Sequence, residues 1–179
     1  MRSAFRLGKD KELVTFANKV NQNQLSSNAE KSVAMYYLGK TAYNKGDLDQ
    51  AIIAFEQVAR ISTNNQAAEA RYLIAKAYYT QGKIADSETQ IANSNEKNRA
   101  YPVWIAKSLL LQAQIFIDKD DLLNARAAVE AVQENFKDDA NLLQEANEIM
   151  TEIETKENLS NRIRVENSDG TLQLDTTGN

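Results

Sequence analysis

Residues 35–55 read MYYLGKTAYNKGDLDQAIIAF, a pattern typical of two helices joined by a tight turn. A helical run precedes Gly46, and a second helical run begins at Leu48. A glycine that follows a helix can adopt the left-handed conformation that stops it, and the adjacent Asp47 can cap the next helix. The stretch therefore predicts a helix–turn–helix hairpin.

The turn at Gly46 recurs along the chain at a nearly constant interval. Gly8 and Gly82 stand in the same position between helical runs, and Asp120 takes the place of glycine in a fourth turn. The intervals between these four positions are 38, 36 and 38 residues. The chain is thus predicted to be a succession of helical hairpins.

Apolar residues within each hairpin recur at helical spacing, as at Ala51, Phe55 and Ala59. The expected helices span residues 29–45, 48–61, 66–81, 84–93, 102–117, 122–136 and 140–159. The last of them carries one apolar stripe and polar remaining faces, as a capping helix at the end of a stack requires. We expect a helical repeat domain over residues 1–159 and a flexible polar tail over residues 160–179.

The composition supports an all-α fold and narrows the available chemistry. One proline and six glycines in 179 residues leave few helix breakers. Histidine and cysteine are absent, which excludes histidine general bases, thiol nucleophiles, disulfides and zinc fingers. The net charge of −4 disfavours a nucleic-acid partner, and no apolar stretch approaches the length of a membrane span. We therefore expect no enzymatic activity, cofactor, metal or membrane insertion.

The hairpins resemble the tetratricopeptide repeat, a helical hairpin of about 34 residues with two short consensus blocks. In the first full hairpin, Met35, Leu38 and Gly39 match the first block, with methionine in place of tryptophan. Ala51 and Phe55 match the second block. The later hairpins follow the pattern mainly through their spacing.

The resemblance covers about residues 1–136 and implies an α-solenoid of about three full repeats, with a partial repeat before them. The pattern also resembles the end of large tetratricopeptide proteins of the bacterial cell envelope, which slightly favours the envelope or periplasm over the cytoplasm. Only seven residues precede Gly8, so the first helix is short. We expect a C-terminal piece of a longer repeat protein, and a naturally short first helix is the alternative.

The resemblance implies a binding face. In this family the first helix of each hairpin lines a concave groove that holds a peptide or a protein partner. Two Tyr/Lys triplets 36 residues apart, and one residue of the third hairpin, take these groove positions: Tyr36, Lys40, Tyr43, Tyr72, Lys76, Tyr79 and Gln114. Tyrosine supplies rigid contact area, and lysine can meet acidic groups or a C-terminal carboxylate. Alternatively, the tyrosines pack between neighbouring helices.

Two functions follow from this reading. The first is a non-catalytic scaffold that binds a protein or peptide partner in the groove. The second is a structural or self-association module, whose open N-terminal face, with Phe5 and Phe16, stacks on upstream repeats or on another copy to form a homo-oligomer.

Overall fold

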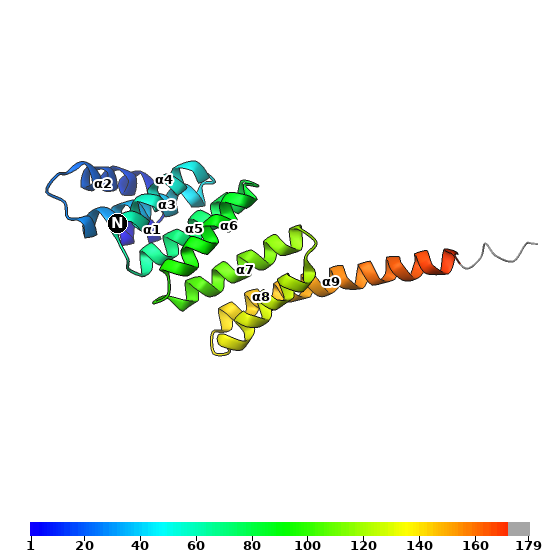
Figure 1. Cartoon of the computed structure of the whole chain (residues 1–179). Coiled ribbons are helices and arrows are strands. Elements are labelled where there is room, and N and C mark those ends of the chain that lie inside the picture. The colour runs from blue at the N-terminus through cyan, green and yellow to red at the C-terminus, as the bar shows by residue number, and fades with distance from the viewer. Residues whose placement is uncertain (172–179) are drawn as a thin grey trace, which may run out of the picture. The chain divides into compact units, whose positions relative to one another are not determined.

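A computed structural model shows a fold made entirely of helices over the part of the chain that it describes (Figure 1). It describes the backbone of residues 1–171 and the side chains of residues 1–160. The helices are α1 Arg2–Arg6, α2 Asp10–Gln22, α3 Asn28–Asn44, α4 Leu48–Ile61, α5 Asn65–Thr80, α6 Ile84–Lys97, α7 Pro102–Asp118, α8 Leu122–Asn135 and α9 Ala140–Thr171. The chain divides into an N-terminal unit, Met1–Leu111, and a C-terminal unit, Gln112–Asn179, with α7 crossing the boundary.

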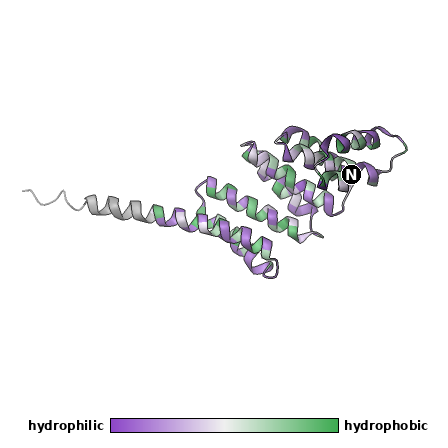
Figure 2. Ribbon diagram, turned by 180° about the vertical axis from the view of Figure 1, so that it is seen from behind, coloured by the Kyte–Doolittle hydropathy of each residue, from purple (hydrophilic) through white to green (hydrophobic). Residues whose placement is uncertain are grey.

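The N-terminal unit is a stack of helical hairpins. Helix α3 packs on α4, α5 packs on α6, and α4 also packs on α5, so each hairpin leans on the next. We call α1, α3 and α5 the A helices and α2, α4 and α6 the B helices. The A helices contact one another, α1 with α3 and α3 with α5. Apolar and polar residues alternate along the helices (Figure 2), as expected where each helix buries one side.

Four left-handed residues make the tight turns between the helices. Gly8, Gly46 and Gly82 have φ angles of 65°, 78° and 73°, and Asp120 has a φ of 59°. They lie at the positions where the sequence predicts the turns. Glycine adopts this conformation without a steric penalty, and Asp120 is a residue type that tolerates it.

Side-chain caps fix where several helices begin. The Asp47 carboxylate accepts a hydrogen bond from the Gln50 amide nitrogen at 3.2 Å, which caps α4 as the sequence predicts. Ser27 and Glu30 form a reciprocal capping box at the start of α3. Each cap satisfies a backbone donor that the first helical turn leaves unpaired.

The first full hairpin closes around one glycine and one aromatic ring. Phe55 of α4 is fully buried, and it faces Gly39 of α3. A Cβ atom on Gly39 would lie 2.6 Å from Cε1 and 2.7 Å from Cδ1 of that ring. The absence of a side chain at Gly39 therefore allows the two helices to approach closely.

A buried polar network joins the second hairpin to its neighbours. Arg71 of α5 is 5 % exposed, and it donates to the Asn98 side chain at 3.0 Å and to the carbonyls of Ala59 and Ser62 at 3.2 Å. Asn98 is fully buried and donates to the Ala68 carbonyl at 3.1 Å and to the Ser94 hydroxyl at 2.9 Å. These bonds place a positive charge inside the stack with neutral acceptors around it.

In the C-terminal unit, α8 packs on the first part of α9, and α9 continues beyond it (Figure 1). Leu142, Ala146 and Ile153 are buried, so the predicted apolar stripe is the packed face. The predicted end of this helix at 159 is wrong, because α9 extends to Thr171. Residues 160–171 contain no proline, so a helix already formed can propagate through them. The rest of the predicted tail, 172–179, lies outside the described residues.

Candidate partner-binding face of the A helices

Tyr36 and Lys40 of α3 converge on one carboxylate of α5. The Tyr36 hydroxyl donates to Oε2 of Glu69 at 2.6 Å, and the Lys40 ammonium donates to Oε1 of the same residue at 2.7 Å. Burial, together with the Glu69 carboxylate, raises the pKa of the Tyr36 phenol far above its usual value. The phenol therefore stays protonated and acts as a donor, which holds Glu69 in place beside Lys40.

A small pocket of about 290 Å³ opens beside this cluster, between α1, α3 and α5. Arg2, Phe5 and Arg6 line it from α1, and the Phe5 ring lies 5.4 Å from the ring of Tyr37. The Arg2 side chain donates to the Tyr37 hydroxyl at 3.4 Å. The short first helix is thus anchored on α3, and it contributes the two guanidinium groups of Arg2 and Arg6 to the pocket.

The second triplet is arranged differently. Tyr72 is 5 % exposed, and its ring lies 5.8 Å from that of Trp104. The Trp104 indole donates to the Asn65 side chain at 2.9 Å, so Trp104 packs against the preceding hairpin. The Lys76 ammonium lies 6.0 Å from the centre of the Tyr72 ring, at cation–π distance. Tyr72 is therefore a buried packing residue beneath Lys76, whereas Lys76 is half-buried and partly open to solvent.

The remaining predicted groove residues are Tyr43, Tyr79 and Gln114. Tyr43 and Tyr79 are half-buried on α3 and α5. Burial raises the pKa of the Tyr43 phenol, and a hydrogen bond with Thr80 opposes that rise. Gln114 belongs to the C-terminal unit, where its amide donates to both carboxylate oxygens of Glu152 at 3.2 and 3.3 Å.

Sequence reasoning missed Glu69, the residue that joins Tyr36 to Lys40. Glu69 stands three residues before Tyr72, on the helix that neighbours α3 in the stack. The sequence did contain a signal for Glu69. It places a lysine, Lys40, on one A helix and a carboxylate near the start of the next A helix, where the two could pair. Arg2 and Arg6 were also missed, because the short first helix offered no repeat pattern to align.

Residues 1–160 are those whose side chains the structure describes. That part of the chain holds no group of three or more acidic side chains placed to bind a metal ion. No helix in the described part is long and apolar enough to cross a membrane.

Comparison with known proteins identifies the first full hairpin. The tetratricopeptide repeat family matches residues 32–65, which cover most of α3, all of α4 and the first residue of α5. Searches of curated proteins and of solved structures give no match. Tetratricopeptide repeats in general mediate protein–protein contacts and are not themselves catalytic. The chain therefore contains one tetratricopeptide repeat at residues 32–65, and the hairpins next to it continue the same helical architecture.

Proposed function

We propose that the chain is a non-catalytic scaffold that holds an acidic segment of a protein partner against the A helices, beside Lys40. The observation that carries this proposal is the local charge. Arg2, Arg6 and Lys40 line the pocket between α1, α3 and α5, with Glu69 as the carboxylate among its lining residues. The chain as a whole carries a charge of −4, so this basic face stands out against an acidic background.

We infer different roles for the predicted groove residues from their burial and contacts. Tyr36 and Tyr72 are buried, so they position their neighbours rather than touch a partner. Lys40 and Lys76 are partly exposed and can meet carboxylates. Glu69 holds Lys40 extended toward α5, so its ammonium is ordered before a partner arrives, which lowers the entropic cost of binding.

Reversing the two lysine charges is expected to abolish partner capture. With the chain as bait in a lysate, the variant Lys40→Glu/Lys76→Glu should retain at most a tenth of the partner that the unmodified chain retains. The reason is that an acidic segment would then face carboxylates at both positions, and like charges repel. Quantitative mass spectrometry of the captured proteins provides the measurement.

The matched control is Lys11→Glu/Lys97→Glu, which changes the net charge equally at two exposed positions away from the pocket. This variant should capture the partner as the unmodified chain does. Circular dichroism must show that both variants are helical. Equal capture by the folded Lys40/Lys76 variant would refute the binding face.

A second candidate is self-association through the exposed apolar residues of the N-terminal end. Leu7 is 71 % exposed and Phe16 of α2 is 52 % exposed, whereas Phe5 packs on Tyr37. If this end binds another copy, sedimentation should show dimers that increase with concentration, and Leu7→Ser/Phe16→Ser should shift them to monomers. Leu123→Ser, which alters a residue that is 79 % exposed in the C-terminal unit, is the control. A monomer at all concentrations excludes this function.

A further inference from the structure

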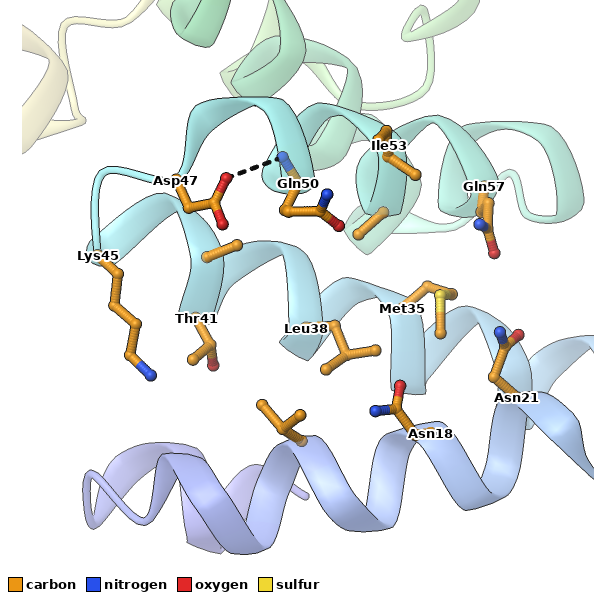
Figure 3. A pocket seen from close by; sticks show the side chains of 13 residues that line it. Asn18, Asn21, Met35, Leu38, Thr41, Lys45, Asp47, Gln50, Ile53 and Gln57 are labelled. Carbon is orange, nitrogen blue, oxygen red and sulfur yellow. Dashed lines mark hydrogen bonds between the residues drawn. The ribbon is translucent and has the colours of Figure 1, made fainter.

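A groove of about 420 Å³ lies on the B-helix side of α3, with α2 and α4 as its walls (Figure 3). We call it the outer groove. Its apolar surface comes from Met35, Leu38 and Ala42 on the floor, Val14 on one wall, and Ile53 and Ala54 on the other. Ile53 is 49 % exposed at the rim. The floor is therefore mainly apolar, and the groove is open to solvent at the rim.

The rims of the outer groove carry amides from both walls. Asn18 and Asn21 come from α2, and Gln50 and Gln57 come from α4. In Figure 3 these side chains lie along the two sides of the space above α3. Within the described residues none of the four amide groups has a side-chain hydrogen bond to the protein. Each therefore has a donor and an acceptor available for an occupant.

The floor contains one unsatisfied polar group. Thr41 lines the outer groove and is 4 % exposed, and its hydroxyl has no hydrogen-bond partner within the described residues. A hydroxyl on a helix commonly bonds back to the carbonyl four residues earlier, as Thr15 does with Lys11 at 2.8 Å. Leaving such a group unpaired and buried is unfavourable.

The charge distribution indicates an uncharged occupant. The charged lining residues, Lys45 and Asp47, stand together at one end. The Lys45 ammonium already pairs with Asp10 at 3.0 Å, and the Asp47 carboxylate already caps α4. An occupant carrying a charge at the centre of the outer groove would lose water and meet no opposite charge there.

The two amide rims indicate an extended chain rather than a helix. An extended segment presents free N–H and C=O groups along both of its edges, and its side chains alternate between the floor and solvent. In a helical occupant the backbone N–H and C=O groups already bond to one another. The side-chain amides on the rims of the groove would then meet only side chains of that occupant. The floor from Met35 to Lys45 spans about 15 Å of helix, which is the length of about five extended residues.

We propose that the outer groove binds an extended, uncharged segment of a partner protein, with aliphatic side chains at alternate positions directed onto Met35 and Leu38. This surface is distinct from the face at Lys40. Met35, Leu38 and Ala42 recur at helical spacing on one side of α3, and Tyr36, Lys40 and Tyr43 recur on another. The two proposals can therefore fail independently.

The test selects ligands without assuming a partner. A displayed library of random heptapeptides is bound to the full chain and counter-selected on the variant Ile53→Glu, which places a charge on the rim. We expect enrichment of uncharged sequences with aliphatic residues at alternate positions. The enriched peptide is then synthesised and titrated into ¹⁵N-labelled chain. The side-chain NH₂ signals of Asn18, Asn21, Gln50 and Gln57 should shift.

Three further measurements sharpen the result. Methylating the backbone nitrogens of the peptide should weaken binding at least tenfold, because it removes the donors that meet the amide rims. Gln57→Glu should also weaken binding at least tenfold, whereas Lys40→Glu and the surface control Leu123→Glu should leave it unchanged. The proposal is overturned if no peptide is enriched. It is also overturned if the enriched peptides are charged or bind as helices, or if the shifts occur around Lys40.

Discussion

Replacing Asn98 by alanine is expected to lower the free energy of unfolding by about 3–5 kcal/mol. Asn98 is fully buried and holds three groups: the Arg71 guanidinium, the Ala68 carbonyl and the Ser94 hydroxyl. Alanine would leave all three without that partner, and one of them is charged. Urea unfolding followed by circular dichroism provides the measurement, since the loss is a large part of the stability of a domain of this size.

The charge of Arg71 explains why the effect should be so large. Burial lowers the pKa of the guanidinium, an effect that the Tyr101 phenol opposes, yet arginine remains protonated in proteins. Removing Asn98 therefore leaves a buried cation with fewer acceptors. Arg71→Met removes the cation itself and leaves three neutral acceptors without that donor: the buried Asn98 side-chain oxygen and the half-buried carbonyls of Ala59 and Ser62. It should cost less than Asn98→Ala.

A double variant separates the charge from the packing. Arg71→Met/Asn98→Ala should cost clearly less than the sum of the two single changes, because the buried cation is no longer present to be left unpaired. Asn95→Ala, three residues earlier on α6, is the matched control, since the Asn95 side-chain oxygen has no hydrogen-bond partner within the described residues. That variant should be close to neutral. Additive losses would contradict the role of the charge.

The hairpins could be predicted from the sequence because their signals are local. A left-handed residue at Gly8, Gly46, Gly82 and Asp120, followed by a new apolar helical pattern, needs no knowledge of distant contacts. Where polar residues face the core, local reasoning failed. The sequence predicted that the second helix of the second hairpin ends at 93, but α6 continues to Lys97, because Ser94 is buried and bonded to Asn98.

The candidate binding face shows the same limit. The spacing correctly places Tyr36 and Lys40 on one side of their helix, since both reach the Glu69 carboxylate of α5. It could not identify Glu69, because that pairing depends on how far α5 is shifted along α3. The outer groove was missed for a related reason. It is formed where α2 and α4 stand apart across α3, and the spacing of residues along one helix carries no information about that gap.

Replacing Gly39 by alanine is expected to destabilise the chain by about 1–3 kcal/mol. Alanine normally stabilises a helix relative to glycine by about 1 kcal/mol, so the expected sign is the reverse of the ordinary one. The reason is the fully buried ring of Phe55, which would lie 2.6 Å from the new methyl group. Thermal and urea unfolding of the single variant measure the effect.

The second hairpin indicates a background in which Gly39→Ala should no longer destabilise the chain. Ala75 and Ile91 stand 36 residues after Gly39 and Phe55, and both are buried. The second hairpin thus has alanine where the first has Gly39, and the smaller isoleucine where the first has Phe55. In a Phe55→Ile background, Gly39→Ala should therefore be neutral or stabilising by up to about 1 kcal/mol, and the double-mutant cycle should show strong coupling. If Gly39→Ala has the same cost in both backgrounds, contact with the Phe55 ring is not what requires glycine.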